Sequence, residues 1–160
     1  MLATLRSLAM RRLRGLGLLL LGFYGGFLAA TALVKRMFPS RGDADSDEVA
    51  LVAIRDGVRL QSRAQAFRGG SMLAWFGGVS ADLRQATLAP GAHLTASAVF
   101  GGIAIEVPAG WRVESTASTL AGGVAVNVPE PEDPAAPTLT VDCMATFGGV
   151  AIKVGDAAES

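Results

Sequence analysis

The stretch AVFGGIAIEVP, residues 98–108, places an aromatic residue and two glycines directly before a run in which apolar residues alternate with other residues. Three more copies of this phrase occur: FGGVSADL from Phe76, AGGVAVNV from Ala121 and FGGVAIKV from Phe147. The first glycines fall at positions 77, 101, 122 and 148, which are 24, 21 and 26 residues apart. Repeats of this period are typical of one supersecondary unit stacked on the next. The sequence therefore predicts a repeat protein or part of one.

After each glycine pair the apolar residues share one parity, in the order apolar, small, apolar, polar, apolar. A period of two residues is the signature of a strand with one buried and one solvated face. The residues before the glycines alternate as well, so each copy predicts two short strands that meet at the glycines. The expected inward set is Val79, Ala81, Leu83, Ile103, Ile105, Val107, Val124, Val126, Val128, Val150, Ile152 and Val154.

The glycine pairs predict corners between these strands. Glycine reaches positive φ without the roughly 1–2 kcal/mol that a Cβ adds, and its missing side chain lets neighbouring coils approach. We expect the preceding phenylalanine to fill the interior of each bend, so that truncating Phe100 or Phe147 to alanine costs about 3–5 kcal/mol. The third copy has Ala121 in place of phenylalanine, and Trp111 is our candidate to fill that volume.

Two all-β architectures fit this pattern. In the first, each copy is one coil of a parallel β-solenoid, with equivalent strands stacked about 4.8 Å apart. In the second, each Gly-Gly pair is a hairpin turn and the domain is an antiparallel meander or sandwich. The repeated parity at coil-like spacing favours the solenoid. We interpret residues 48–70, with their own FRGG at 67–70, as a degenerate capping coil, and we expect the proline-containing turns at 89–91, 108–110 and 129–137 to lie outside the paired strands.

The amino-terminal part of the chain has a different composition. No charged residue occurs from Gly15 to Val34, a run that as a helix rises about 30 Å, roughly the hydrocarbon thickness of a bilayer. More positive charge precedes this run than follows it. The pattern therefore predicts a single membrane span with a cytoplasmic amino terminus and an extracytoplasmic β domain. The alternative is a cleaved signal peptide that ends near the small residues at 30–32.

The segments expected are a basic amino-terminal segment over 1–14, a transmembrane helix over 15–36, an acidic linker over 37–48, a β-rich domain over 49–155 and a tail over 156–160. In the linker, DADSD at 43–47 resembles the opening of a calcium loop, but Glu48 and Ile54 stand where such a loop needs glycine and a bidentate glutamate. We interpret it as a solvated acidic spacer. All fourteen acidic residues lie after position 41, which argues against nucleic acid as a partner of the β domain.

Few residues offer catalytic or metal-binding chemistry. His93 is the only histidine and Cys143 the only cysteine, so the chain has neither an intrachain disulfide nor a Cys/His metal cluster. We interpret His93 as an exposed loop residue, and Cys143, which belongs to an inward series, as a small hydrophobic residue. Packing is the expected role of Trp75 and Trp111.

The sharpest enzymatic hypothesis concerns Asp82 and Glu106, which hold the same outward position in successive copies. Stacked carboxylates could approach the separation of about 5 Å that retaining glycosidases use. The equivalent positions carry Asn127 and Lys153, however, which favours a solvated polar column. The sequence therefore predicts no catalytic residue, no cofactor and no metal site.

The segments FGGVSADL, AVFGGIAIEVPAGWRVE and ATFGGVAIKV resemble the carboxy-terminal domain of LiaF-like cell-wall-active antibiotics response proteins of bacteria, over about residues 67–154. The resemblance implies a β-rich, non-catalytic domain at the membrane, tied to sensing envelope stress and restraining a two-component sensor kinase. Two features depart from the family: LiaF-like proteins commonly carry several membrane spans, and the third repeat here reads AGG.

On this basis we expect a membrane-anchored, non-enzymatic protein of the bacterial cell envelope. It would regulate an envelope stress response through protein–protein contacts, and its expected partners are the lipid bilayer and a membrane sensor kinase or another envelope protein. The alternative is a structural or self-associating scaffold, because a solenoid without a cap exposes a strand edge that invites another copy.

Overall fold

The computed structural model describes residues 21–37 and 39–155 of the 160-residue chain. The chain divides into two compact units, Met1–Phe38 and Pro39–Ser160. Residues 21–37 of the first unit form an α-helix. Within the described residues, no helix has both the length and the apolar character that a membrane crossing requires. The transmembrane helix predicted over 15–36 is thus not supported there, although its first part, like the segments 1–14 and 156–160, lies outside the described residues.

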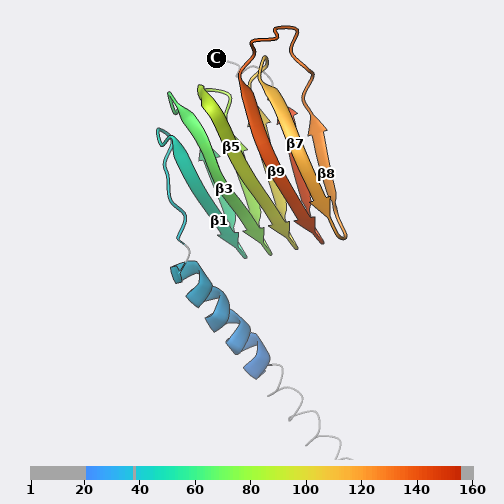
Figure 1. Ribbon diagram of the computed structural model, residues 1–160. Helices are drawn as coiled ribbons and strands as arrows, with labels where there is room; N and C mark the ends of the chain where they lie inside the picture. The colour runs from blue at the N-terminus through green and yellow to red at the C-terminus, as the bar shows by residue number, and fades with distance from the viewer. Residues whose placement is uncertain (1–20, 38, 156–160) are drawn as a thin grey trace, which may run out of the picture. The chain divides into compact units, whose positions relative to one another are not determined.

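The second unit contains ten strands in two parallel sheets that lie face to face (Figure 1). The sheets have the orders β1-β3-β5-β9-β7 and β2-β4-β6-β10-β8, so each odd strand and the following even strand form one coil of a two-sided solenoid. All pairings between these strands are parallel, which confirms the parallel arrangement and makes the antiparallel meander wrong. The strands are β1 Glu48–Ile54, β2 Gly57–Gln61, β3 Phe67–Trp75, β4 Gly78–Asp82, β5 Leu88–Val99, β6 Gly102–Val107, β7 Arg112–Thr119, β8 Gly123–Asn127, β9 Thr138–Thr146 and β10 Gly149–Val154.

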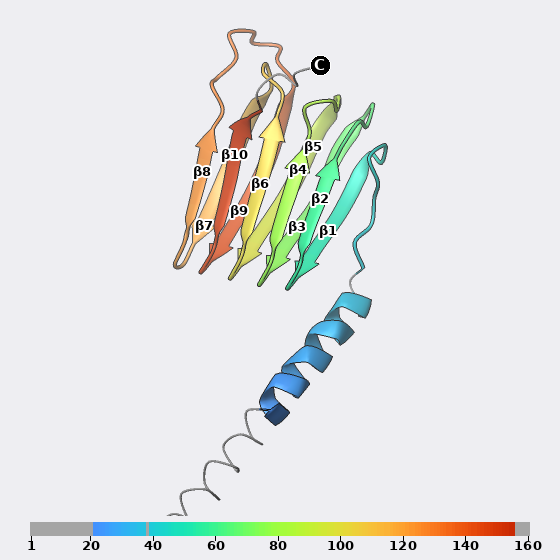
Figure 2. The same cartoon turned by 180° about the vertical axis from the view of Figure 1, so that it is seen from behind.

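The coils do not stack in the order of the sequence. The last coil, β9 and β10, lies between the β5–β6 coil and the β7–β8 coil, which therefore forms the edge of both sheets (Figure 2). The inward residues explain this order. Val141 and Ala145 of β9 are fully buried, whereas Ser115 and Thr119 of β7 stand beside them in the register. Burying a hydroxyl without a hydrogen-bond partner costs free energy, so the β7–β8 coil is favoured at the edge, where its inward hydroxyls meet water.

The core lies between the two sheets and follows the predicted alternation. The inward residues at 79–83, 103–107 and 150–152 are buried, whereas Val124, Val126 and Val128 of the edge coil are only half-buried. Trp111 is also buried, but the prediction that it fills the volume beside Ala121 is wrong. All eight residues of β7, at about 3.3 Å each, separate the two positions.

Residues 39–47 lie along the edge of β1. Arg41 forms an antiparallel bridge with Ala50, in which each N–H donates to the other residue's C=O. The Ser40 hydroxyl accepts from the N–H of Val52 at 2.9 Å and donates to its C=O at 3.3 Å. The acidic side chains of Asp43, Asp45 and Asp47 are exposed, as predicted for a solvated spacer, but the backbone of this segment also accepts hydrogen bonds from the β domain at Ala44 and Asp47. We call β1, β2 and residues 39–47 the covered end, and β7 with β8 the open end.

Two local predictions need correction. The capping coil predicted over 48–70 exists as β1 and β2, but its corner is formed by residues 55–57, and the FRGG at 67–70 lies inside β3. The turn predicted at 89–91 lies within the bounds of β5. There the pairing with β3 jumps from Leu88 to His93, so Pro90 sits in an irregular stretch that makes no paired contact.

Candidate functional site

The three FGG corners carry a column of exposed aromatic rings. Phe76 stacks on Phe100, and Phe100 on Phe147, with 4.9 Å between ring centroids and interplanar angles of 4° and 7°. These residues are 43%, 49% and 54% exposed, so the prediction that the phenylalanines fill the interior of the bends is wrong. We call the three rings the aromatic ladder.

The left-handed backbone at these corners belongs to the phenylalanines. Their φ angles are 54°, 50° and 51°, whereas none of the glycines in the FGG phrases has a positive φ. The predicted glycine conformation is therefore wrong. A left-handed residue costs about 1–2 kcal/mol when it carries a Cβ. Stacking against a neighbouring ring contributes about 0.5–1.5 kcal/mol per pair, which offsets much of that strain.

The first glycine of each corner lets the coils approach, which confirms the other half of the prediction. A Cβ on Gly101 would overlap the backbone of Gly77, and one on Gly148 would overlap the backbone of Gly101. A Cβ on Gly102 would come no closer than 4.0 Å to Gly149, which is ordinary contact. Packing thus requires the first glycine and tolerates a side chain at the second.

A shallow apolar groove of about 510 Å³ begins two residues after the phenylalanines, on the outer face of the even-numbered sheet. Its floor is made of small residues, because the outward positions of β6, β8 and β10 begin with glycine and continue with alanine. The floor residues are Gly102, Gly123, Gly149, Ala104, Ala125 and Ala151. The groove therefore lies between the aromatic ladder and the next outward row, which is polar.

That row contains the carboxylates of the enzymatic hypothesis. Asp82, Glu106 and Lys153 are neighbours in the register. Lys153 Nζ lies 3.0 Å from Glu106 Oε1, and Arg84 Nη2 lies 2.7 Å from Asp82 Oδ2. The hydrogen bonds from Arg84 lower the pKa of Asp82 against the opposing effect of its partial burial. A carboxylate held in its ionised form is poorly suited to be the proton donor in glycoside hydrolysis.

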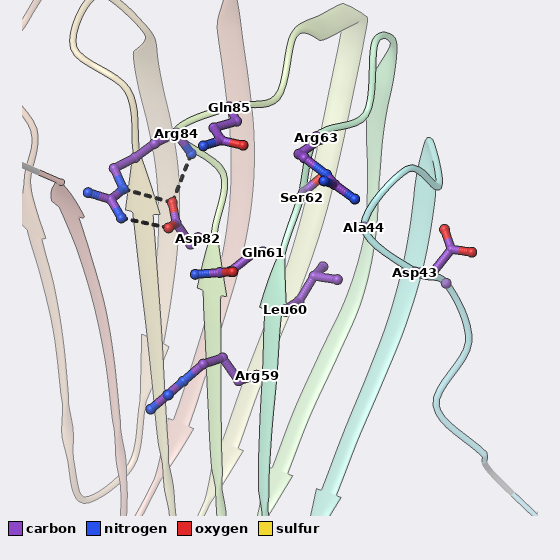
Figure 3. A pocket seen from close by; sticks show the side chains of 11 residues that line it. Asp43, Ala44, Arg59, Leu60, Gln61, Ser62, Arg63, Asp82, Arg84 and Gln85 are labelled. Carbon is purple, nitrogen blue, oxygen red and sulfur yellow. Dashed lines mark hydrogen bonds and ion pairs between the residues drawn. The ribbon is translucent and has the colours of Figure 1, made fainter. Parts of the chain in front are cut away.

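A polar recess of about 680 Å³ lies at the covered end, and Figure 3 shows its lining. Two of its arginines are engaged with acidic residues. Arg84 turns to Asp82 in Figure 3, and Arg63 Nε lies 3.7 Å from Asp45 Oδ1 with both side chains largely exposed. Arg63 and Arg84, two of the cationic residues that line the recess, are thus held in ion pairs.

His93 lies in β5, not in the loop that the sequence predicted. Its Nε2 lies 3.2 Å from Asp142 Oδ2, with both side chains about half exposed. Sequence reasoning missed this pair because β5 is paired with β9, a strand from the displaced last coil, and not with the next odd strand along the chain.

Of the remaining candidates, Cys143 and Trp111 are buried in packing roles, whereas the packing role predicted for Trp75 is not confirmed. Burial, together with the nearby charge of Asp142, raises the pKa of the Cys143 thiol, which confirms the residue as a small hydrophobic core member. Trp111 is buried as predicted, whereas Trp75 is 39% exposed beside the aromatic ladder. Among residues 21–37 and 39–155, no group of three or more His, Cys, Asp or Glu is placed to hold a metal ion.

The comparisons with known proteins identify no relative of this chain. The chain matches no protein-family model, no curated protein and no solved structure. The resemblance to LiaF-like proteins therefore stays a prediction from the repeat phrases.

Proposed function

We propose that this protein is a non-enzymatic docking scaffold of the bacterial cell envelope, which regulates an envelope stress response by contacting a membrane partner through its aromatic ladder. The partner class is a sensor kinase, as the LiaF-like resemblance implies. The amino-terminal segment anchors the chain in the membrane, with the amino terminus inside and the β domain outside.

One observation carries the docking role: the aromatic ladder is exposed on a rigid scaffold. Three stacked rings form a contiguous apolar surface beside a groove floored by glycine and alanine. Contiguous exposed apolar surface of this kind marks interaction sites, and aromatic residues dominate binding energy at protein interfaces. The small residues of the floor would let a partner's backbone approach the sheet.

A photo-crosslinking amino acid in place of Phe100, in the full chain in bacterial membranes, tests this role. We expect adducts that contain a sensor histidine kinase. The matched control carries the same group at Thr95, an exposed position on the outer face of β5, in the other sheet. Equal adducts at both positions, or none at Phe100, would contradict docking through the ladder.

The proposed topology needs its own measurement. Asp47→Cys places a thiol at an exposed position of the segment before β1. An impermeant maleimide should label it in intact cells if the β domain is outside. Labelling that requires cell lysis would put the domain in the cytoplasm.

A second candidate function, a self-associating scaffold, is favoured by the open end of the solenoid. If a crosslinking group at Ser115 of β7 yields adducts between copies of this chain, and the group at Phe100 yields no kinase adduct, the scaffold function replaces the regulatory one.

A further inference from the structure

The open end exposes backbone groups of two strands at once. The N–H groups of Arg112 and Leu120 bond to the C=O groups of Pro137 and Ala145, on the β9 side of β7. Because alternate residues of a parallel strand direct their backbone groups to the same neighbour, the odd-numbered residues of β7 direct theirs away from β9. These edge-facing residues are Val113, Ser115, Ala117 and Thr119.

The same alternation applies to β8. The N–H of Gly123 bonds to the C=O of Gly148 on the β10 side, so Val124 and Val126 direct their backbone groups to the open edge. In the described part of the chain, neither β7 nor β8 has a strand neighbour on this side. Neither set of edge-facing residues contains a charge or a proline, the devices that protect natural strand edges.

We propose that two copies of this chain associate through their open ends, with β7 and β8 of each copy pairing antiparallel with the same two strands of the other across a two-fold axis. This association uses a different surface from the aromatic ladder, so either proposal can fail without the other.

Continuity with the stack identifies the occupant as a second copy. A single extended peptide covers one strand edge and leaves the half-buried Val124, Val126 and Val128 facing water between the sheets. A second solenoid presents two edges at the same separation and the same type of inward residue. It therefore extends both ladders and the core together, in the way that the β7–β8 coil already packs on the β9–β10 coil.

The covered end explains why the association closes as a dimer. A head-to-tail stack would have to pair β7 with β1 and β8 with β2. The N–H groups of Ala50 and Val52 in β1 already bond to Arg41 and Ser40, so one of the two edges that such a stack needs is occupied. An interface that uses the same surface on both copies closes at two, whereas a head-to-tail one propagates.

The contact area between the two copies sets the expected affinity of the dimer. Eight residues of β7 span about 26 Å, and the sheets of such a stack lie about 10 Å apart, so each copy contributes only a few hundred Å². Interfaces of this size are at the weak end of protein association. We therefore expect a concentration-dependent equilibrium between monomer and dimer.

Sedimentation of the full chain in detergent, over a range of concentrations, tests the proposal. We expect a monomer–dimer equilibrium for the unmodified chain. Ala117→Pro removes one edge-facing N–H per copy and should weaken dimerisation roughly 30-fold while leaving the fold intact, because proline is tolerated on a free strand edge. Thr116→Pro is the matched control, since its N–H faces β9 and its loss should lower the unfolding temperature instead.

Three outcomes would overturn the proposal: an unmodified chain that stays monomeric, an Ala117→Pro chain that dimerises as tightly as the unmodified one, or a ladder of higher oligomers. If circular dichroism shows that Ala117→Pro does not fold, Ser115→Lys replaces it, because an inward-pointing charge at the edge opposes pairing without changing the backbone. A short bismaleimide should also join two copies of Ser115→Cys but not of Gln61→Cys, which lies at the covered end. Equal crosslinking of both would place the contact elsewhere.

Discussion

The covered end and the open end terminate the same two sheets in different ways. At the covered end, the N–H groups of three alternate residues of β1, Ala50, Val52 and Ile54, donate to the Arg41 carbonyl, the Ser40 hydroxyl and the Asp56 carboxylate. At the open end, the edge-facing groups of β7 and β8 have no strand neighbour among the described residues. The difference shows that this chain covers the outer edge of β1 with its own residues, whereas the outer edges of β7 and β8 are available for a partner.

The corner residues also differ between the two ends of the stack. A Cβ at the first corner position points toward the covered end, because Gly77 faces Asp56, Gly101 faces Gly77 and Gly148 faces Gly101. Asp56 starts this series and has no coil behind it. It therefore keeps a side chain, which it uses to accept a hydrogen bond from the N–H of Ile54 at 2.8 Å.

The largest expected effect on stability comes from adding a side chain at the first corner position of an inner coil. Gly101→Ala should lower the free energy of unfolding by about 3 kcal/mol or more, because the new Cβ overlaps the backbone of the neighbouring coil and the coils must separate. Asp56→Ala, at the same structural position of the covered end, should cost only about 1 kcal/mol for a lost hydrogen bond. Urea unfolding followed by circular dichroism measures both.

Gly102→Ala is the control for that comparison. Its Cβ would have ordinary contacts, so it should cost about 1 kcal/mol or less. If Gly101→Ala and Gly102→Ala were equally stable, the close approach of the coils would not be what requires glycine.

The second effect compares burial in the stack and at the open end. Ile152 is fully buried and lies beside the half-buried Val126 in the register. Ile152→Ala should cost about 2–5 kcal/mol, and Val126→Ala about 1 kcal/mol, because the edge side chain loses less burial. The measurement is made at a concentration where the chain is monomeric. If the chain dimerises through the open end, Val126 becomes buried. The destabilisation caused by Val126→Ala should then increase with protein concentration.

The third effect concerns the aromatic ladder, which lies outside the core along its whole length. Phe100→Ala should cost about 1–3 kcal/mol through the loss of two stacking contacts, less than the 3–5 kcal/mol expected for a buried ring. Phe100→Gly should be less destabilising than Phe100→Ala, because glycine adopts the φ of 50° without strain. The reverse order of the two variants would argue against a strained corner.

The smallest effect is pH-dependent and belongs to the coil beside the covered end. Arg84 lowers the pKa of Asp82 below the ordinary value of 3.8. The ion pair therefore stabilises the fold above that value and is lost as the pH falls through the lowered pKa of the folded state. The unmodified chain should exceed Asp82→Asn in stability at pH 7 by under about 1 kcal/mol, and the difference should be smaller at pH 2.

Chemical denaturation at both pH values measures that difference. A gap that stays constant from pH 7 to pH 2 would mean that Asp82 acts through its shape and not its charge.

Much of the fold could be predicted because strand alternation is a local property. The inward parity of Ile103 and Ile105, and the equivalence of the four glycine pairs, follow from residues a few positions apart. The aromatic ladder could not be predicted in the same way. Whether Phe100 or Gly101 takes the left-handed conformation depends on which of them meets the neighbouring coil, and the carbonyl oxygen of Gly77 occupies the space beside Gly101.

The sequence by itself determined that the chain makes short strands in repeated units, and which side chains those strands turn inward, because both depend on the period-two pattern within each copy. It favoured the parallel arrangement but left the antiparallel meander open. Only the tertiary structure decided which coil lies next to which, how residues 39–47 finish one end, and that the rings stack in solvent. The order of the coils depends on which inner faces are most stabilised by burial. Burial is less favourable for the inner face with Ser115 and Thr119 than for the one with Val141 and Ala145. The β7–β8 coil therefore lies at the open end.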